Sequence, residues 1–152
     1  MNGPFESSIL QFLVRIFLVP VMLLFGVYVV VHGETSPGGG FQGGAIIAAA
    51  IILARLSLDR EQSQTLLSTQ AAMRFVSIGA LVALGVGLIP LLAGSDFLDY
   101  GALPVPSDDG QVLPHLTLRG LGIFVFEAGI AVAVMAVIVT IFDVLTEATD
   151  DR

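Results

Sequence analysis

The chain has 152 residues and a net charge of -7, and 55% of its residues are hydrophobic while only 12% are charged. Soluble domains carry roughly 25% charged residues, so the composition excludes an ordinary soluble globule and indicates an integral membrane protein. Six arginines without lysine exclude nucleic acid as a partner, because phosphate binding needs clustered cations, and the absence of cysteine excludes a disulfide framework or a thiolate metal site.

Four apolar stretches define the predicted architecture. Hydrocarbon about 30 Å thick needs about 20 mostly apolar residues per helix. The stretches that meet or approach this length are residues 9–31, 43–58, 75–94 and 120–142. We predict an all-α integral membrane protein with four transmembrane helices in one membrane domain, residues 1–152, and a Gly-rich loop between helices 1 and 2. The start of the chain holds Glu6 and no cation, which disfavours a cleaved signal peptide.

The first span contains Pro20 one turn inside its uncharged core, where a membrane helix tolerates a mild kink. His32 follows at the end of this span. It can cap the helix C-terminus, where a cation suits the dipole, or it can form a pH-sensitive pair or a transient ligand site with Glu34. We favour the cap, and we keep His32 and Glu34 as candidate residues of an ion or proton pathway.

Residues 32–44 join the first two spans through a stretch that is rich in glycine and nearly free of charge. An interior Gly costs roughly 1 kcal/mol relative to Ala in a helix, and Pro removes a donor. We therefore expect this stretch to turn rather than to form a helix. Pro37 and Gly38 suit the central positions of a type II turn. The later glycines let the backbone pack closely on another element: Gly39, Gly40, Gly43 and Gly44.

The spacing of Gly38, Gly40 and Gly43 also matches the dinucleotide-binding fingerprint. That fingerprint acts only after a short buried strand inside a βαβ unit. Here a long apolar run precedes it, and no lysine follows to form a phosphate loop. We therefore expect no nucleotide site.

The second span is short, because its apolar core from Gly43 ends at Arg55. About a dozen residues give roughly 18 Å at helical rise. Either the glycine stretch enters the membrane as buried backbone, or Arg55 snorkels to the interface and the helix continues through Leu58. We expect Arg55, Arg60 and Arg74 to be orientation and headgroup anchors, with lipid recognition as the alternative.

Small residues recur on the third and fourth spans at the spacing of one helix face. Such a stripe lets another helix approach closely. We expect these faces to meet each other or a neighbouring subunit, and we assign helix packing to Gly79, Ala83, Gly87, Gly122, Gly129 and Ala133, with Ala136 on the same face. Between the two spans, residues 95–117 form a long polar connector, and Pro90 ends or bends the third helix.

Glu127 is the one charged residue within the fourth span. It lies eight positions, roughly 12 Å, beyond Arg119, well inside the hydrocarbon. A carboxylate there costs on the order of 2.5–3.5 kcal/mol, so we expect it to be protonated, paired with another subunit, or facing a hydrated cavity. Two alternatives stay open: Glu127 binds a cation or passes a proton at a subunit interface, or it is a neutral acid hydrogen-bonded between helices.

The arginines predict the orientation in the membrane. With four spans, both termini and the connector after the second span share a side that collects five arginines, while the other side has only Arg119. Cytoplasmic segments carry the excess of positive charge. We therefore expect both termini in the cytoplasm of a multi-pass protein.

The segment Pro37-Gly38-Gly39-Gly40-Phe41-Gln42-Gly43-Gly44, after a span that ends in His32-Gly33, resembles the signature of the B subunit (MrpB or MnhB) of multisubunit Mrp-type cation/proton antiporters. The polar connector after the second span and Gly122-Ile123-Phe124-Val125 near the start of the last extend the resemblance over most of the chain. Gln42 separates it from related domains of the large A subunit and of membrane-bound hydrogenases. Glu34 stands where the family often has histidine.

The resemblance implies an accessory subunit of a hetero-oligomeric, complex I-related antiporter that exchanges cytoplasmic Na+ for external protons in a prokaryotic cell membrane. In that family the proton-conducting lysines and glutamates belong mainly to the large A and D subunits. The B subunit is then needed for assembly or for shaping an ion route, with residues 37–44 as a subunit docking loop. The implied partners are the other antiporter subunits and the lipid bilayer, with Na+ and H+ as the transported ions.

Two other functions are alternatives to this one. The chain could be a self-sufficient small transporter or channel that forms homo-oligomers around Glu127, or the equivalent subunit of a membrane-bound hydrogenase-type complex. Few internal polar residues and no detectable inverted repeat disfavour the homo-oligomer. We expect no enzyme, no cofactor and no metal site, because the chain lacks cysteine and paired histidines and its clustered carboxylates lie in connectors.

Overall fold

The computed structural model describes residue 9 and residues 11–33, 39–57, 67–103 and 115–150. Every regular element in these ranges is a helix. A π-helical turn, η1 (Val14–Leu18), leads into α2 (Val19–Val31), and α3 (Gly40–Leu56), α5 (Thr69–Leu92), a short 3-10 turn η2 (Tyr100–Ala102) and α6 (His115–Asp150) follow. The expected turn at Pro37 and Gly38 lies outside the described residues, as do Glu34 and Arg60.

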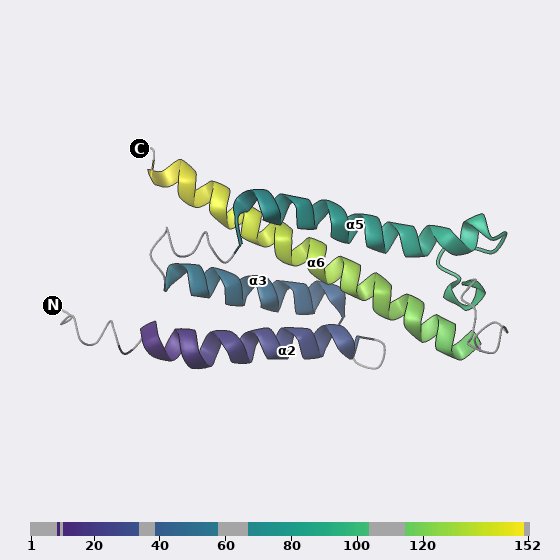
Figure 1. The fold of residues 1–152 in the computed structure, drawn as a ribbon, viewed down its shortest axis with the longest axis horizontal. Coiled ribbons are helices and arrows are strands. Elements are labelled where there is room, and N and C mark those ends of the chain that lie inside the picture. Colours follow the sequence, from purple (N-terminus) through teal and green to yellow (C-terminus); the bar gives the residue numbers. More distant parts are fainter. Residues whose placement is uncertain (1–8, 10, 34–38, 58–66, 104–114, 151–152) are drawn as a thin grey trace.

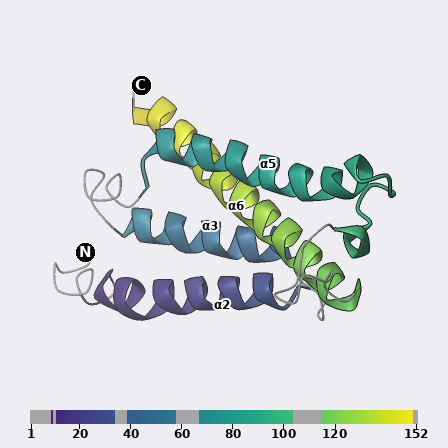
Figure 2. The ribbon, with the colours of Figure 1, turned by 45° about the vertical axis from the view of Figure 1, so that its right-hand side comes forward.

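The four long helices alternate in direction, so that α2 begins and α6 ends at the same end of the molecule (Figure 1). Their order in space is α2, α3, α6, α5, with each helix packed on the next. The turned view shows α6 running obliquely between α3 and α5 (Figure 2). The last helix of the chain is therefore the central one, and it contacts both the helix that starts in the glycine-rich stretch and the third apolar span.

Three described helical stretches are long and apolar enough to cross a membrane: Gln11–Val31, Thr69–Leu92 and Thr117–Glu147. The fourth apolar helix, α3, has 17 residues, or about 25 Å at helical rise. With three long apolar helices and one shorter one, the all-helical chain is a four-span membrane protein.

The helix bounds differ from the expected spans in three places. The second helix begins at Gly40, three residues before the expected start at residue 43, so the expectation that this part of the glycine-rich stretch forms no helix is wrong for Gly40, Phe41 and Gln42. The third begins at Thr69, because the side chain of Ser68 accepts a hydrogen bond from the N–H of Ala71 and caps it. The last helix extends well beyond residues 120–142 at both ends.

Pro20 lies just after a π-helical turn. The N–H of Val19 bonds to the carbonyl oxygen of Val14, five residues earlier, and Pro20 has no N–H to donate. A π turn is one way in which a membrane helix accommodates a proline without a free end.

The small residues of α5 and α6 lie where these helices cross. A Cβ on Gly79 would lie 2.6 Å from the backbone of both Gly129 and Ala133, and a Cβ on Gly129 would lie 2.8 Å from the backbone of Ala83. The two backbones therefore approach closely, as small-residue faces allow.

Two of the expected packing glycines do not face a helix. Gly87 lies under Phe97 and Leu98, and Gly122 lies under the ring of Tyr100. Residues 97–100 of the connector between α5 and α6 thus lie over both helices and fill the space that these glycines leave. Leu103 and Tyr100 of the same connector pack with Val86 and Leu118 in a small buried cluster.

Candidate functional site

Glu127 of α6 caps the first turn of α3. The N–H of Gly40 donates a hydrogen bond to Oε2 of Glu127, 87 positions away in the sequence. A helix leaves its first N–H groups without intrahelical acceptors, and their partial positive charge favours an anion. The N-cap residue Gly39 makes no side-chain capping bond, so the carboxylate of a neighbouring helix takes that place.

Glycine at positions 39 and 40 makes room for this carboxylate. Gly39 has a φ of 137°, which L side chains rarely adopt, and a Cβ there would lie 2.6 Å from Oε2 of Glu127. A Cβ on Gly40 would overlap the carbonyl oxygen of Glu127. Any larger residue at either position would push α6 away from the start of α3.

The next two glycines, Gly43 and Gly44, let α3 pack closely against both α2 and α6. A Cβ on Gly44 would lie 2.6 Å from the carbonyl oxygen of Ala131 in α6, and a Cβ on Gly43 would lie 2.8 Å from the carbonyl oxygen of Gly26 in α2. Glycine has a low helix propensity, yet these positions are helical, because the backbones of α2, α3 and α6 come so close here that a side chain would not fit. Between the two pairs, Phe41 and Gln42 are exposed, with 65% of Phe41 accessible.

His32 ends α2 as its C-cap residue. Its N–H donates to the carbonyl oxygen of Tyr28, and its ring Nδ1 lies 3.0 Å from the same oxygen. The ring also stacks on Tyr28, with 4.0 Å between the ring centroids. The geometry is that of a helix cap, while the proposed partner Glu34 lies outside the described residues. The next residue, Gly33, brings the end of α2 to the backbone of Gly39.

A groove runs along the first part of α6 to Glu127. It has a volume of about 490 Å³ and is lined by Val30, Val31, Thr117, Gly120, Leu121, Phe124 and Glu127. We call it the Glu127 groove. The α6 residues that line it recur every three or four positions, so they form one face of that helix. The only ionisable side chain among these lining residues is Glu127.

The capped end of α3 lies at membrane depth. Glu127 is within the apolar stretch Thr117–Glu147 and about 12 Å along the helix from Arg119. Non-helical backbone at this depth is tolerated only where protein or water satisfies its polar groups. Since Glu127 satisfies the Gly40 N–H, the buried start of α3 at Gly39 and Gly40 has an acceptor inside the protein at this depth.

Tyr100 is a neighbour of Glu127 that the sequence patterns did not single out. Its ring covers Gly122, and its centroid lies 6.3 Å from that of Phe126. Burial, and then the negative charge of Glu127, raise the pKa of Tyr100 above its ordinary value of 10.0. The phenol therefore stays neutral to a higher pH in the folded protein than in the unfolded chain.

A buried ion pair joins three helices at the opposite end of the bundle. Arg55 of α3 pairs with Asp143 of α6, and their side chains are 4% and 5% exposed. Thr69 at the start of α5 donates from Oγ1 to Oδ2 of Asp143 at 3.0 Å, and Nη2 of Arg55 donates to the carbonyl oxygen of Leu67 at 2.5 Å. Among the described residues, Nε of Arg55 has no partner.

This ion pair corrects two expectations. Arg55 is buried rather than snorkelling to a lipid headgroup, because Asp143 neutralises it inside the protein. Asp143 lies one residue beyond the expected fourth span, 120–142, whereas in the structure it is inside α6 and is 4% exposed. One feature of the sequence could have indicated this pair: both residues stand at the ends of apolar stretches on the same predicted side of the membrane. Arg74 is exposed, as a headgroup anchor requires.

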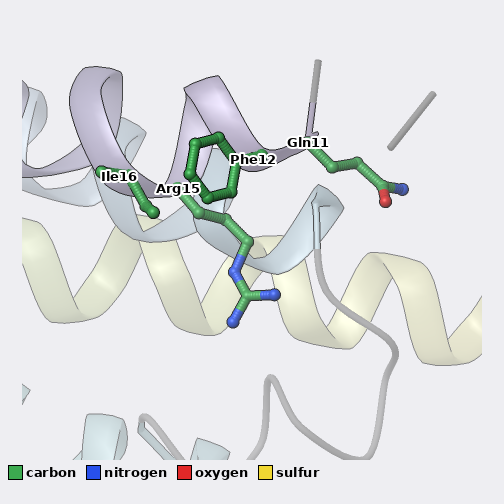
Figure 3. A pocket seen from close by; sticks show the side chains of 4 residues that line it. All are labelled: Gln11, Phe12, Arg15 and Ile16. Atoms are coloured by element: carbon green, nitrogen blue, oxygen red, sulfur yellow. The ribbon is translucent and has the colours of Figure 1, made fainter. Parts of the chain in front are cut away.

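A second hollow lies at the start of the first helix (Figure 3). It is lined by Gln11, Phe12, Arg15 and Ile16 and has a volume of about 480 Å³. The close view shows the guanidinium of Arg15 extended away from its helix. Phe12 and Ile16 are 59% and 62% exposed. An extended cation between exposed apolar side chains suits the membrane interface, where the charge reaches the headgroups.

The fold and this site define a multi-pass membrane protein whose short second helix is capped from the central helix. Within the described ranges, no group of three His, Asp or Glu side chains could hold a metal ion.

Comparison with known proteins identifies the family. A family model described as a domain related to the MnhB subunit of Na+/H+ antiporter matches residues 9–140. A protein of Staphylococcus saprophyticus named "Putative antiporter subunit mnhB2" is 34% identical over 141 residues, which cover 90% of this chain and 92% of that protein. A protein of the same name from Staphylococcus aureus strain Newman is 34% identical over 137 residues, with the same coverage of both chains. The chain belongs to the MnhB family.

Proposed function

We propose that this chain is an accessory membrane subunit of a multisubunit Na+/H+ antiporter and acts together with the other subunits of that complex. The observation that carries the proposal is the family match over residues 9–140 on a four-helix membrane fold. An accessory role also fits the charges at the site, since Glu127 is the only ionisable side chain among the residues that line its groove. A proton relay normally needs several such groups within reach of one another.

The orientation that we propose places both termini in the cytoplasm of a prokaryotic cell. Among the described residues, Arg15, Arg55 and Arg74 lie toward the end where α2 begins and α6 ends, and Arg119 lies toward the other. This distribution follows the positive-inside rule. The capped start of α3 then faces the outer half of the membrane, and the Glu127 groove opens toward the outer side.

We assign the subunit a role in assembly. The glycine-rich segment of residues 37–44 is the proposed docking loop, and its exposed side chains Phe41 and Gln42 are the ones that a neighbouring subunit can reach. The buried glycines Gly40, Gly43 and Gly44 hold the segment in place by packing on α2 and α6. Exposed apolar side chains on α2 and α5 supply further surface for lipid or for other subunits.

Purification tests this assignment against a self-sufficient transporter. The chain is expressed alone or with the remaining subunits of its complex, and its oligomeric state is measured in mild detergent. We expect a stable, uniform assembly only with the co-expressed partners. A uniform homo-oligomer formed by the chain alone would contradict the assignment and support a transporter that works by itself.

A place on the ion or proton route is the second candidate function, and the Glu127 groove favours it. The groove brings the outer side of the protein to a carboxylate at membrane depth, which is where a proton or cation would be received. His32 and Glu34 remain candidate members of the same route.

Glu127→Gln distinguishes the two roles. The amide oxygen can still accept the Gly40 N–H, so we expect the variant to assemble. If it assembles and transports at the wild-type rate, the carboxylate of Glu127 is not on the ion or proton route. A complex that assembles with Glu127→Gln but loses antiport places the acid on the route.

A further inference from the structure

The Glu127 groove has the shape of a contact surface for another transmembrane helix. Its α6 wall extends from Thr117 to Glu127, about 15 Å at helical rise, or nearly three turns. Val30 and Val31 form the opposite wall at the end of α2. Gly120 has no side chain, which lets a facing backbone approach α6 closely.

The charge in the groove indicates what such a helix must carry. Oε2 of Glu127 accepts the Gly40 N–H, and among the described residues no donor is found for Oε1. Lipid acyl chains cannot donate a hydrogen bond, and an unsatisfied carboxylate oxygen in hydrocarbon is costly. An occupant of the groove that supplies a donor satisfies this oxygen, and a positive charge complements the carboxylate best.

We propose that the groove binds a transmembrane helix of a neighbouring subunit that places a lysine against Oε1 of Glu127. A guanidinium binds a carboxylate most favourably through both oxygens, whereas an ammonium is a point charge that one oxygen satisfies. Because Oε2 is already occupied, lysine fits better than arginine. This inference rests on the proposed function, since it needs a hetero-oligomeric complex, and it names the chemistry of the partner surface.

The sequence makes a direct chemical test possible. The chain contains no lysine, so a bond between Glu127 and a lysine side chain can form only with another protein. A membrane-permeant carbodiimide activates the carboxyl group as an O-acylisourea. The adjacent lysine amine then attacks the acyl carbon to form an amide, and the carbodiimide leaves as its urea with the oxygen atom lost from the carboxyl group.

The experiment treats the whole purified complex with dicyclohexylcarbodiimide and maps cross-linked peptides by mass spectrometry. We expect a cross-link between Glu127 and a lysine in a transmembrane segment of another subunit. It should disappear in Glu127→Gln and persist in the control Glu147→Gln, which removes an exposed carboxylate outside the groove. Modification of Glu127 by the reagent without any cross-link would overturn the lysine assignment.

A photo-cross-linking residue, p-benzoylphenylalanine in place of Phe124, tests helix docking independently of charge. We expect it to bond the same transmembrane segment that carries the lysine. Bonding only to lipid in the intact complex would overturn the docking inference while leaving the proposed function in place. Failure of the wild-type chain to co-purify with other subunits would instead contradict the proposed function itself.

Discussion

At the scale of single residues, Glu127 and Gly40 form one unit. The carboxylate supplies the cap that glycine cannot supply to its own helix, and glycine supplies the space that the carboxylate needs. An unpaired carboxylate and an unpaired helix N–H are each costly in hydrocarbon. Here each provides the hydrogen-bond partner of the other. Both features therefore occur at the same depth of the bundle.

Gly40→Ala should destabilise the protein, because the new Cβ overlaps the carbonyl oxygen of Glu127 and one of the two helices must move. We expect a loss of about 1–3 kcal/mol, as for overpacked cores. Gly85→Ala is the matched control, since it is also helical but has no atom within 4 Å of its Cβ. The control should be neutral or up to about 1 kcal/mol more stable. Thermal stability of the purified complex measures both, and equal effects would contradict the close approach at Gly40.

Tyr100 makes stability depend on pH in a defined direction. The pKa of Tyr100 is raised in the folded protein, first by burial and then by Glu127. Its contribution is therefore complete below the ordinary value of 10.0 and is lost as the pH rises toward the folded pKa. We expect wild type to lose stability above about pH 10 more steeply than Tyr100→Phe, which cannot ionise. Parallel pH curves for the two proteins would argue against a shifted phenol.

At the scale of helices, run length predicted four spans, but the boundaries depended on tertiary contacts. The start of α3 at Gly40 could not be read from propensity, because a carboxylate from α6 and the backbones of α2 and α6 offset the low helix propensity of glycine. Glu127 was singled out from its position in an apolar run, although nothing in the sequence indicated that Gly40 is its partner. The pairing of Arg55 with Asp143 was missed because its two charges are 88 positions apart.

The buried pair of Arg55 and Asp143 should hold the ends of α3, α5 and α6 together. Removing one partner, in Arg55→Gln or Asp143→Asn, leaves a buried group unpaired, and we expect a loss of about 3–5 kcal/mol. Replacing both at once, as Arg55→Met with Asp143→Leu, should recover much of this loss. The exposed control Arg74→Gln should change stability by less than about 0.5 kcal/mol. A double variant as unstable as the sum of the single ones would show that the two residues act independently.

At the scale of the whole molecule, the chain is a bundle whose central helix, α6, makes a polar contact with α3 near each end of α3. α6 caps α3 through Glu127 toward one end and pairs with Arg55 through Asp143 toward the other. Most of the large apolar side chains on α2 and α5 are exposed, so the bundle presents extensive apolar surface to lipid or to neighbouring proteins. Such a molecule suits an accessory subunit better than an enclosed ion pathway of its own.

The most direct test of the proposed function is Na+-dependent dissipation of an imposed pH gradient in everted membrane vesicles. Vesicles are prepared from cells that express the whole complex, from cells that lack only this chain, and from cells in which the chain is restored on a plasmid. We predict loss of antiport without the chain and recovery when it is restored. Full antiport by a complex that assembles without the chain would contradict its role as a required subunit.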